Sequence, residues 1–462
     1  MDSVLAIDLG GGSLRAALVG RDGRIVASAM RHHQVGEEAD AEDWWAMLVE
    51  AVAELPRAEV RAIIATGFTR SQVLVDGEGR AVRPAQCFAD TRAVAEAGEL
   101  AGVTRGTWLE MTPLHPAARL RWAKAHDPAA FARARHVLQP KDFLVLRLTG
   151  KAASDRISNA WALERRGNVR ALALFRRAGL DASLVPELFD PWDVVGPCTG
   201  LAGFEGVPVM CGAMDTWCAS LGAGASQPGD AYLISGTTDA GGVLADVPGE
   251  AEGLVTLPWG IGLFHTGGPS GAGGDCLQWL TGLLGQPHVA SVAALAERAR
   301  ADLPPLLFLP ALSGERAPSW AAANRGVFAG LDRSHGAAEL ARAVMEGVAF
   351  ADRDLLGGLG FDRLLLGGGG ARSDLWCQIR ADVLGCQVLR TSDQPGLVGA
   401  ALVAWAGLRV YPTLSAALAM LSERADVFRP DRTVIARYQR LFEMFKHLQA
   451  AAATLAHGLS RF

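Results

Sequence analysis

The sequence has no excess of basic residues. Its 44 Lys and Arg side chains are outnumbered by 49 Asp and Glu, which leaves a formal net charge of -5. A protein that follows a nucleic-acid backbone or lies on an anionic membrane needs a positive surface to neutralise phosphates. We therefore expect neither nucleic acid nor a membrane as a partner, and the composition favours a small molecule.

Paired cysteines and long apolar runs are also lacking. The seven cysteines are scattered without a C-x-x-C pair, so neither a zinc site nor a disulfide framework is indicated. No stretch approaches the roughly 20 apolar residues of a membrane span, and the opening MDSVLAIDLG has no basic segment before its apolar run. We expect a cytoplasmic protein.

The chain is long and rich in core-forming residues. With 462 residues, of which 50% are hydrophobic, it exceeds what one compact core accommodates, so we expect two large domains.

A glycine-tipped hairpin occurs twice. Residues 4–9 read as a buried strand, Gly10 to Gly12 as a tight turn and residues 13–19 as the returning strand, and residues 231–243 repeat the design around Gly236. Helical patterns lie between the strands, at residues 41–55, 116–126 and 337–356. This alternation is typical of the α/β class.

The repeat suggests two homologous halves. Glycine, serine and proline cluster at residues 223–229, which predicts a first domain over 1–225, a second over 226–436 and a closing helix within 437–462. Packing of that helix on the first domain is one option. Two such halves resemble the two-domain actin-like ATPase (ribonuclease H-like) fold with an interdomain cleft, although a fold does not fix a function.

Glycine turns of this kind suit phosphate oxygens, because their backbone N–H groups are accessible at close range. The first turn follows Asp8, whose carboxylate could hold Mg²⁺ through water. A third glycine tract, within LLLGGGGARSD at residues 364–374, follows a strand and opens a helix. On local evidence alone, a plain structural turn is the better explanation of the first tract, and glycine-rich turns like the third also occur as packing devices.

Longer motifs are more specific. Residues 326–346 (GVFAGLDRSHGAAELARAVME) match the C-terminal FGGY signature at every constrained position, and DLGGGS, DAEDWW, PKDFLVLRLTG, SGERAP and GGGARSDLW surround it in family order. The chain thus resembles the FGGY carbohydrate kinase family over its whole length, and is most similar to the xylulokinase branch. The resemblance implies an ATP-dependent kinase with ATP on the second domain and sugar on the first. Homodimers are usual in that family.

The resemblance also assigns roles. Asp215, in a G-x-x-D segment between an apolar strand and a small-residue helix, corresponds to the catalytic base, with a helix N-cap as the alternative. Asp8 corresponds to the Mg²⁺-organising aspartate. Trp279 lies where the family can place an indole by the adenosine, although a core tryptophan fits its position too. The implied ATP-binding residues are Gly11, Gly12, Ser13, Gly236, Thr237, Trp279, Gly368, Gly369 and Gly370.

The sugar side departs from the branch. Thr69 and Arg70 stand where the branch has a methionine and a histidine that contact the sugar, Thr216 replaces the asparagine after the base, and Asp90 survives from a W-N-D-G-R type segment. We take these residues, with Asp215, as substrate-binding. Arg70 could pair with Asp90, face solvent, or bind a substrate carboxylate bidentately.

The substrate therefore stays open within limits. We expect a pentulose such as xylulose or a related ketose, with a sugar acid or polyol as the alternative. From a different class, a non-kinase actin-like nucleotide-dependent regulator is a further alternative.

Overall fold

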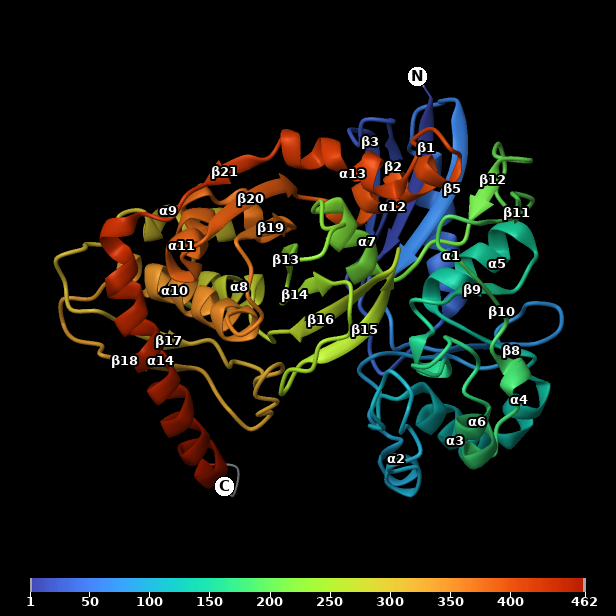
Figure 1. Cartoon of the computed structure of the whole chain (residues 1–462), viewed down its shortest axis with the longest axis horizontal. Helices are drawn as coiled ribbons and strands as arrows, with labels where there is room; N and C mark the ends of the chain where they lie inside the picture. Colours follow the sequence, from blue (N-terminus) through green and yellow to red (C-terminus); the bar gives the residue numbers. More distant parts are fainter. Residues whose placement is uncertain (1, 460–462) are drawn as a thin grey trace. The chain divides into compact units, whose positions relative to one another are not determined.

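The computed structural model describes residues 2–459, and the chain divides into two compact units (Figure 1). Unit 1 comprises Met1–Gly222, Leu257–Gly260 and Gly396–Met420, and unit 2 comprises Ala223–Thr256, Ile261–Pro395 and Leu421–Phe462. The chain passes from unit 1 to unit 2 between Gly222 and Ala223, and later returns to unit 1 with two further segments.

Unit 1 is built on a mixed sheet with strand order β11-β12-β5-β1-β2-β3. β1 is antiparallel to β2 and parallel to β5, and β5 is parallel to β12. β1 and β5 are almost continuously buried, as central strands covered on both faces require. The strands are β1 (Ser3–Leu9), β2 (Ser13–Val19), β3 (Ile25–His32), β5 (Val60–Gly67), β11 (Val194–Pro197) and β12 (Pro208–Met210).

The helices of unit 1 follow their sequence signals. The Asp40 carboxylate caps α1 by accepting from the Glu42 N–H at 2.9 Å, and Trp44 and Leu48 on its buried face join the core with Phe143 of α5. The helices are α1 (Ala41–Ala53), α2 (Val94–Glu99), α3 (Pro116–His126), α4 (Pro128–Arg133), α5 (Pro140–Thr149), α6 (Leu172–Ala178), α7 (Asp215–Gly222), α12 (Pro395–Gly407) and α13 (Leu414–Glu423). Pro395 of α12 and the last three residues of α13 are assigned to unit 2.

Short elements complete this part of the chain. The two-stranded pairings are β4 with β7, β6 with β8 and β9 with β10. Their bounds, with two 3₁₀ turns, are β4 (Glu38–Ala39), β6 (Val73–Val75), β7 (Ala85–Gln86), β8 (His136–Leu138), β9 (Ala153–Asp155), β10 (Glu187–Phe189), η1 (Ala160–Ala162) and η2 (Ala182–Leu184).

A second mixed sheet has the strand order β15-β16-β14-β13-β19-β20-β21, and its strands belong to unit 2 except for Leu257–Gly260 of β15. The second glycine-tipped hairpin is β13 and β14, and β19, which precedes the third glycine tract, lies parallel to β13. The strands are β13 (Ala231–Ser235), β14 (Asp239–Ala245), β15 (Val255–Gly260), β16 (Leu263–Pro269), β19 (Arg363–Gly367), β20 (Gln387–Ser392) and β21 (Asp426–Phe428), with β17 (Leu307–Leu309) and β18 (Val327–Ala329) as a separate pair.

The long helix of the FGGY-like signature is the core helix of unit 2. Val344 and Phe350 on its buried face pack against Trp376, Tyr438 and Phe445.

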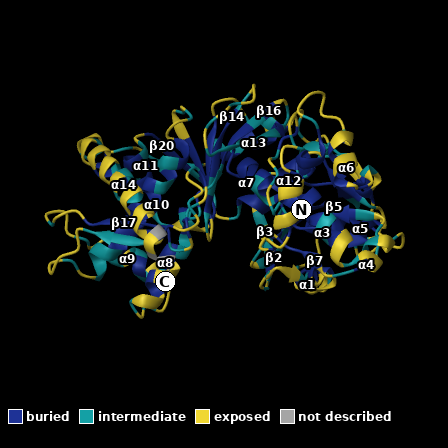
Figure 2. Cartoon of the chain, turned by 90° about the horizontal axis from the view of Figure 1, so that it is seen from below, coloured by how far each residue is buried: buried dark blue, intermediate teal, exposed yellow. Residues whose placement is uncertain are grey.

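The closing helix α14 contacts α10, α11 and β17, all within unit 2. Figure 2 shows the outward side of α14 exposed. The helices are α8 (Gly274–Leu283), α9 (Val289–Ala296), α10 (Ala337–Leu356), α11 (Asp374–Leu384) and α14 (Arg432–Leu459), with the 3₁₀ turn η3 (Gly369–Arg372).

The expected α/β class is confirmed by these two sheets and their helices. Among residues 2–459, none of the helices is both long and apolar enough to cross a membrane.

Candidate active site

Two aspartates predicted from the sequence meet at one end of the unit 1 sheet. Asp8 is the penultimate residue of β1, beside Thr66 on β5. The next residue of β5, Gly67, bridges to Met214, and Asp215 follows directly as the first residue of α7. Both carboxylates therefore lie where neighbouring strands end, the edge at which α/β folds place ligands.

The surroundings of these aspartates favour their protonated forms. Burial raises the pKa of Asp215 to about 6, although the N–H and hydroxyl of Thr216 donate to its Oδ1 at 2.6 and 3.2 Å. Burial and the charge of Asp215 raise the pKa of Asp8 to about 7, with Arg15 opposing. A carboxylate with a pKa near neutrality is suited to accept a hydroxyl proton.

The same two carboxylates fit a magnesium ion. Mg²⁺ in phosphate-transfer sites is held by one or two carboxylates together with water and substrate phosphates. Asp8 and Asp215 supply oxygen donors of that kind, and a bound cation would offset their mutual repulsion. Within residues 2–459 we find no group of three or more His, Cys, Asp or Glu side chains arranged as a metal cage, so water and phosphate would complete the coordination.

The start of α12 closes the site beside Asp8. A Cβ atom on Gly396 would lie 2.9 Å from Oδ2 of Asp8, and one on Gly399 would lie 1.8 Å from the Cys218 carbonyl oxygen of α7. α12 therefore packs on α7 with little between their backbones, and its first turn reaches the Asp8 carboxylate. Gly396 could not be predicted from the sequence, because a glycine early in a helix carries no local signal of what it faces.

The first glycine turn is held by backbone hydrogen bonds. The Gly10 N–H donates to the Ser13 carbonyl at 2.9 Å, and His33 Nε2 lies 2.8 Å from the Gly10 carbonyl. Gly12 at the tip is exposed, whereas a Cβ on Gly11 would be 3.2 Å from the Phe88 ring. The tip leaves its backbone accessible to a ligand.

Arg119 joins two of the predicted substrate residues. Its guanidinium is 1% exposed and donates to the Arg70 carbonyl and, at 2.6 Å, to the Asp90 carbonyl. Arg70 has a φ of 55°, in the left-handed region that is uncommon for an arginine. Backbone strain of this kind clusters at ligand sites. The sequence had assigned no role at the site to Arg119.

The Asp90 carboxylate is engaged inside the protein. It accepts from Arg92 Nη2 at 2.9 Å and from Gln86 Nε2 at 3.0 Å. Although burial acts in the opposite direction, hydrogen bonds from Arg92 lower the pKa of Asp90 to about 2. The carboxylate therefore stays ionised and holds its own loop in place.

His115 is a further polar residue of this region. It is 2% exposed, and burial together with the charge of Arg70 lowers its pKa to about 3. Its Nδ1 accepts from the Ala117 N–H at 3.1 Å, so the proton of the neutral ring is on Nε2. Thr69 and Arg70 are half-buried beside this group. No sequence motif pointed to His115.

In unit 2, the predicted nucleotide-binding turns converge. Gly236 and Thr237 are exposed at the turn between β13 and β14, and their carbonyls accept from the first N–H groups of α8 at 3.0 and 2.9 Å. A Cβ on Gly368 would lie 2.5 Å from the Ser235 carbonyl oxygen, and one on Gly370 would lie 2.1 Å from Ser235 Oγ. Only glycine allows the third tract to approach the turn this closely.

Trp279 of α8 has one covered face and one open side. Its ring stacks on Phe308 with centroids 6.0 Å apart and an interplanar angle of 10°, and 38% of the residue remains exposed. It therefore packs on the core through one face and leaves indole surface exposed, and its role beside adenosine stays a prediction.

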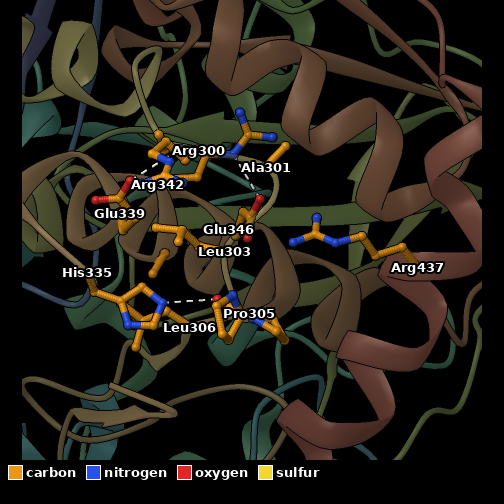
Figure 3. Close-up of a pocket in the computed structure, with 13 residues that line it drawn as sticks. Arg300, Ala301, Leu303, Pro305, Leu306, His335, Glu339, Arg342, Glu346 and Arg437 are labelled. Atoms are coloured by element: carbon orange, nitrogen blue, oxygen red, sulfur yellow. Dashed lines mark hydrogen bonds and ion pairs between the residues drawn. The ribbon is translucent and has the colours of Figure 1, made fainter. Parts of the chain in front are cut away.

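A cavity of about 130 Å³ lies elsewhere in unit 2, between residues 299–306, the first half of α10 and Arg437 (Figure 3). Figure 3 shows Arg342 bound to Glu346 and Arg437 reaching in from α14. None of the residues predicted from the sequence to bind sugar, ATP or metal lines this cavity.

Comparison with known proteins decides the family. The N-terminal domain of the FGGY family of carbohydrate kinases matches residues 3–222, and its C-terminal domain matches residues 231–408. The chain belongs to the FGGY family of carbohydrate kinases. The resemblance read from the signature at residues 326–346 is thereby confirmed.

Named relatives span the whole chain. A xylulose kinase of Escherichia coli K12 is 31% identical, with 96% of this chain and 98% of the relative covered, and one of Bacillus subtilis is 26% identical, with 100% and 99% covered. The crystal structure of a xylulose kinase from Rhodospirillum rubrum superposes with a TM-score of 0.84 at 28% identity, covering 98% and 100%. A ligand-bound xylulose kinase from Lactobacillus acidophilus shares the fold, with a TM-score of 0.88 at 23% identity over 99% and 100% of the two chains.

The FGGY kinase is thus an ATP-dependent carbohydrate kinase with the two-domain actin-like ATPase fold. These findings favour the kinase over a nucleotide-dependent regulator. Among the named relatives, those named xylulose kinase match the chain over nearly its whole length, in agreement with the branch that the sequence indicated.

Proposed function

We propose that this kinase transfers the γ-phosphoryl group of ATP to a hydroxyl of a pentulose such as xylulose, or of a related ketose, in the cytoplasm. Support comes from relatives named xylulose kinase that match the chain over nearly its whole length. The observation that carries the proposal is the placement of Asp8 and Asp215 at adjoining strand ends: Asp8 lies near the end of β1 beside Thr66 of β5, and Asp215 begins α7 directly after the bridge from Gly67 to Met214.

Asp215 acts as the general base. Phosphoryl transfer to an alcohol needs a positioned carboxylate to accept the hydroxyl proton, while catalysis otherwise depends on positioning and charge neutralisation. The Thr216 N–H and hydroxyl fix Oδ1 of Asp215, which leaves Oδ2 to receive the proton. The helix N-terminal position and the base role are compatible, because one oxygen serves each.

Asp8 would hold Mg²⁺. Asp215 lies close enough for its charge to act on Asp8. The ion, when bound, neutralises charge on the ATP phosphates. The residues of this chain that hold the phosphates are the glycine turns: Gly11, Gly12 and Ser13 in unit 1, and Gly236, Thr237 and Gly368 to Gly370 in unit 2. Trp279 offers its open side to the adenine ring.

Thr69, Arg70, Asp90 and Thr216 surround the sugar. The tie from Arg119 to the carbonyls of Arg70 and Asp90 supports this grouping, because it fixes two distant loop segments together. Asp90 stays ionised, and its carboxylate holds the loop in shape through its hydrogen bond from Arg92.

A substrate panel assayed by coupled ADP production tests the proposal. D-Xylulose and related ketopentoses should give sugar-dependent ADP release, whereas aldonates, polyols and sugar-free controls should give little. If an aldonate or a polyol is turned over with much higher kcat/KM than every ketose, the pentulose assignment is wrong.

A further inference from the structure

Four polar side chains lie buried beneath the exposed turn of unit 2. Ser235 ends β13 and Asp239 begins β14, and these two residues flank the turn. Asp352 comes from α10 and Arg380 from α11, and all four are 0% exposed. We call these four residues the buried clamp.

Arg380 is the centre of the buried clamp. Its Nη2 donates to Asp239 Oδ2 at 2.6 Å and to Ser235 Oγ at 2.8 Å, and its Nε donates to Asp352 Oδ2 at 2.9 Å. Ser235 Oγ in turn donates to Asp239 Oδ1 at 2.9 Å. The Trp376 ring covers the guanidinium from 4.2 Å. One cation thus holds both ends of the turn and anchors them to two helices.

Stability alone does not account for this arrangement. Removing charges from water is costly, and replacing a buried ion network by apolar side chains is often neutral or stabilising. Here two carboxylates share one guanidinium at zero exposure. The clearest consequence of the buried clamp is geometric, because it fixes the distance and direction between Ser235 and Asp239.

Two neighbouring segments pack directly against side chains of the buried clamp. A Cβ on Gly370 would lie 2.1 Å from Ser235 Oγ, and one on Gly273, just before α8, would lie 2.7 Å from Asp239 Oδ1. The third glycine tract and the start of α8 are therefore seated against its side chains. Any shift of Ser235 or Asp239 would move these segments together with the turn.

We propose that Arg380 is a positioning residue for the nucleotide: through Ser235 and Asp239 it holds the backbone N–H groups of Gly236 and Thr237, and the adjoining glycine tract, in the geometry that receives the ATP phosphates. The inference rests on the proposed ATP-binding role of these turns. Preorganised backbone donors lose affinity when their supporting contacts are removed.

Arg380→Lys is the direct test. A lysine keeps the positive charge, but its single ammonium cannot reproduce the fork that reaches Ser235, Asp239 and Asp352 together. We expect the Kd for ADP, measured by calorimetry without sugar, to rise about 10-fold, by analogy with metal sites, where losing an outer-shell partner costs about 10- to 100-fold in affinity. The KM for ATP should rise with it, whereas the KM for the sugar should change little.

Arg342→Lys is the matched control. Arg342 also binds a carboxylate and a hydroxyl in unit 2, Glu346 at 2.8 Å and Tyr438 at 2.9 Å, yet it belongs to the cavity of Figure 3 rather than to the turn. It should lower the Tm without changing the Kd for ADP.

Ser235→Ala keeps the inference testable should Arg380→Lys fail to fold. It removes only the hydroxyl shared by Arg380 and Asp239, and ADP should bind several-fold more weakly. ADP affinity equal to that of the wild type in folded Arg380→Lys, or in Ser235→Ala where Arg380→Lys does not fold, would overturn the proposal. Failure of the wild type itself to bind ADP would instead refute the ATP site of the proposed function.

Discussion

A Cβ atom on Gly396 would lie 2.9 Å from Oδ2 of Asp8 and 3.3 Å from its Cγ. Gly396→Ala should therefore turn the Asp8 carboxylate away from its position. Because Asp8 is proposed to organise Mg²⁺, we expect the Mg²⁺ concentration that gives half-maximal activity to rise about 10-fold, the lower end of the cost of disturbing the surroundings of a metal ligand. Direct Mn²⁺ binding in the presence of ADP should weaken in parallel.

Two comparisons isolate the contact between Gly396 and Asp8. Gly358→Ala, at an exposed position with nothing within 4 Å of the added Cβ, should leave metal dependence unchanged. In an Asp8→Ala background the carboxylate is gone, so Gly396→Ala should not lower the free energy of unfolding further. Contacting residues show this kind of coupling in a double-mutant cycle. Wild-type Mn²⁺ binding by Gly396→Ala would refute this account of Gly396.

Asp215→Asn keeps the shape of the side chain and removes the proton acceptor. We expect kcat to fall by about 10²- to 10⁴-fold, the usual contribution of a positioned general base. ADP should bind with unchanged affinity, since the proposed phosphate-binding turns of unit 2 do not involve Asp215. Near wild-type turnover by the variant would show that another group accepts the proton.

Arg119→Lys tests the link between the two sugar-side segments. A single ammonium cannot replace both hydrogen bonds to the Arg70 and Asp90 carbonyls, and losing a charge-assisted bond costs about 1.5–3 kcal/mol. We expect the KM for the sugar to rise about 10-fold or more with the Kd for ADP unchanged. Arg121→Lys, on the same helix but paired with exposed Glu99, serves as the control. Equal sugar KM values for the two variants would contradict the grouping.

His265 should make the stability of the protein depend on pH. Burial lowers the pKa of His265 to about 3, from 6.5, and Tyr232 Oη lies 3.0 Å from its Nδ1. Between these values the unfolded chain binds a proton that the folded protein does not, so the free energy of unfolding falls as the pH falls from 6.5 towards 3. The slope for one proton is about 1.4 kcal/mol per pH unit.

His265→Gln retains an acceptor for Tyr232 but cannot titrate. In urea unfolding between about pH 6.5 and pH 4, the free energy of unfolding should therefore change less steeply with pH than in the wild type. The difference should correspond to about one proton. His126→Gln, at an exposed position, should keep the full slope. An unchanged slope for His265→Gln would mean that this histidine is protonated in the folded state.

Local patterns predicted the elements well because each carried its own signal. Proline at the first helical position and a buried apolar face mark α3, whose bounds 116–126 agree with the structure. The alanine-rich run 337–356 is α10, capped by the Glu339 carboxylate on the Gly336 N–H at 2.9 Å. Turn glycines and strand patterns likewise indicated β1 and β2.

The residues that support the site were not predictable in this way. Arg380 lies 28 residues from Asp352 and 141 from Asp239 in the sequence, so only the folded sheet and helices bring them together. Gly396 likewise faces Asp8 because α12 returns to unit 1 late in the chain. Motifs reveal groups placed beside each other by a turn, whereas such contacts depend on tertiary packing.

In the proposed reaction this FGGY kinase makes a pentulose phosphate from ATP, with Asp215 as the base. The most direct measurement is ³¹P NMR of wild type and Asp215→Asn incubated with ATP, Mg²⁺ and D-xylulose. We expect the wild type to produce a phosphomonoester resonance in step with ADP, no phosphate release without sugar, and almost no product from Asp215→Asn. ATP consumption that yields only inorganic phosphate, or equal ester formation by Asp215→Asn, would contradict the account.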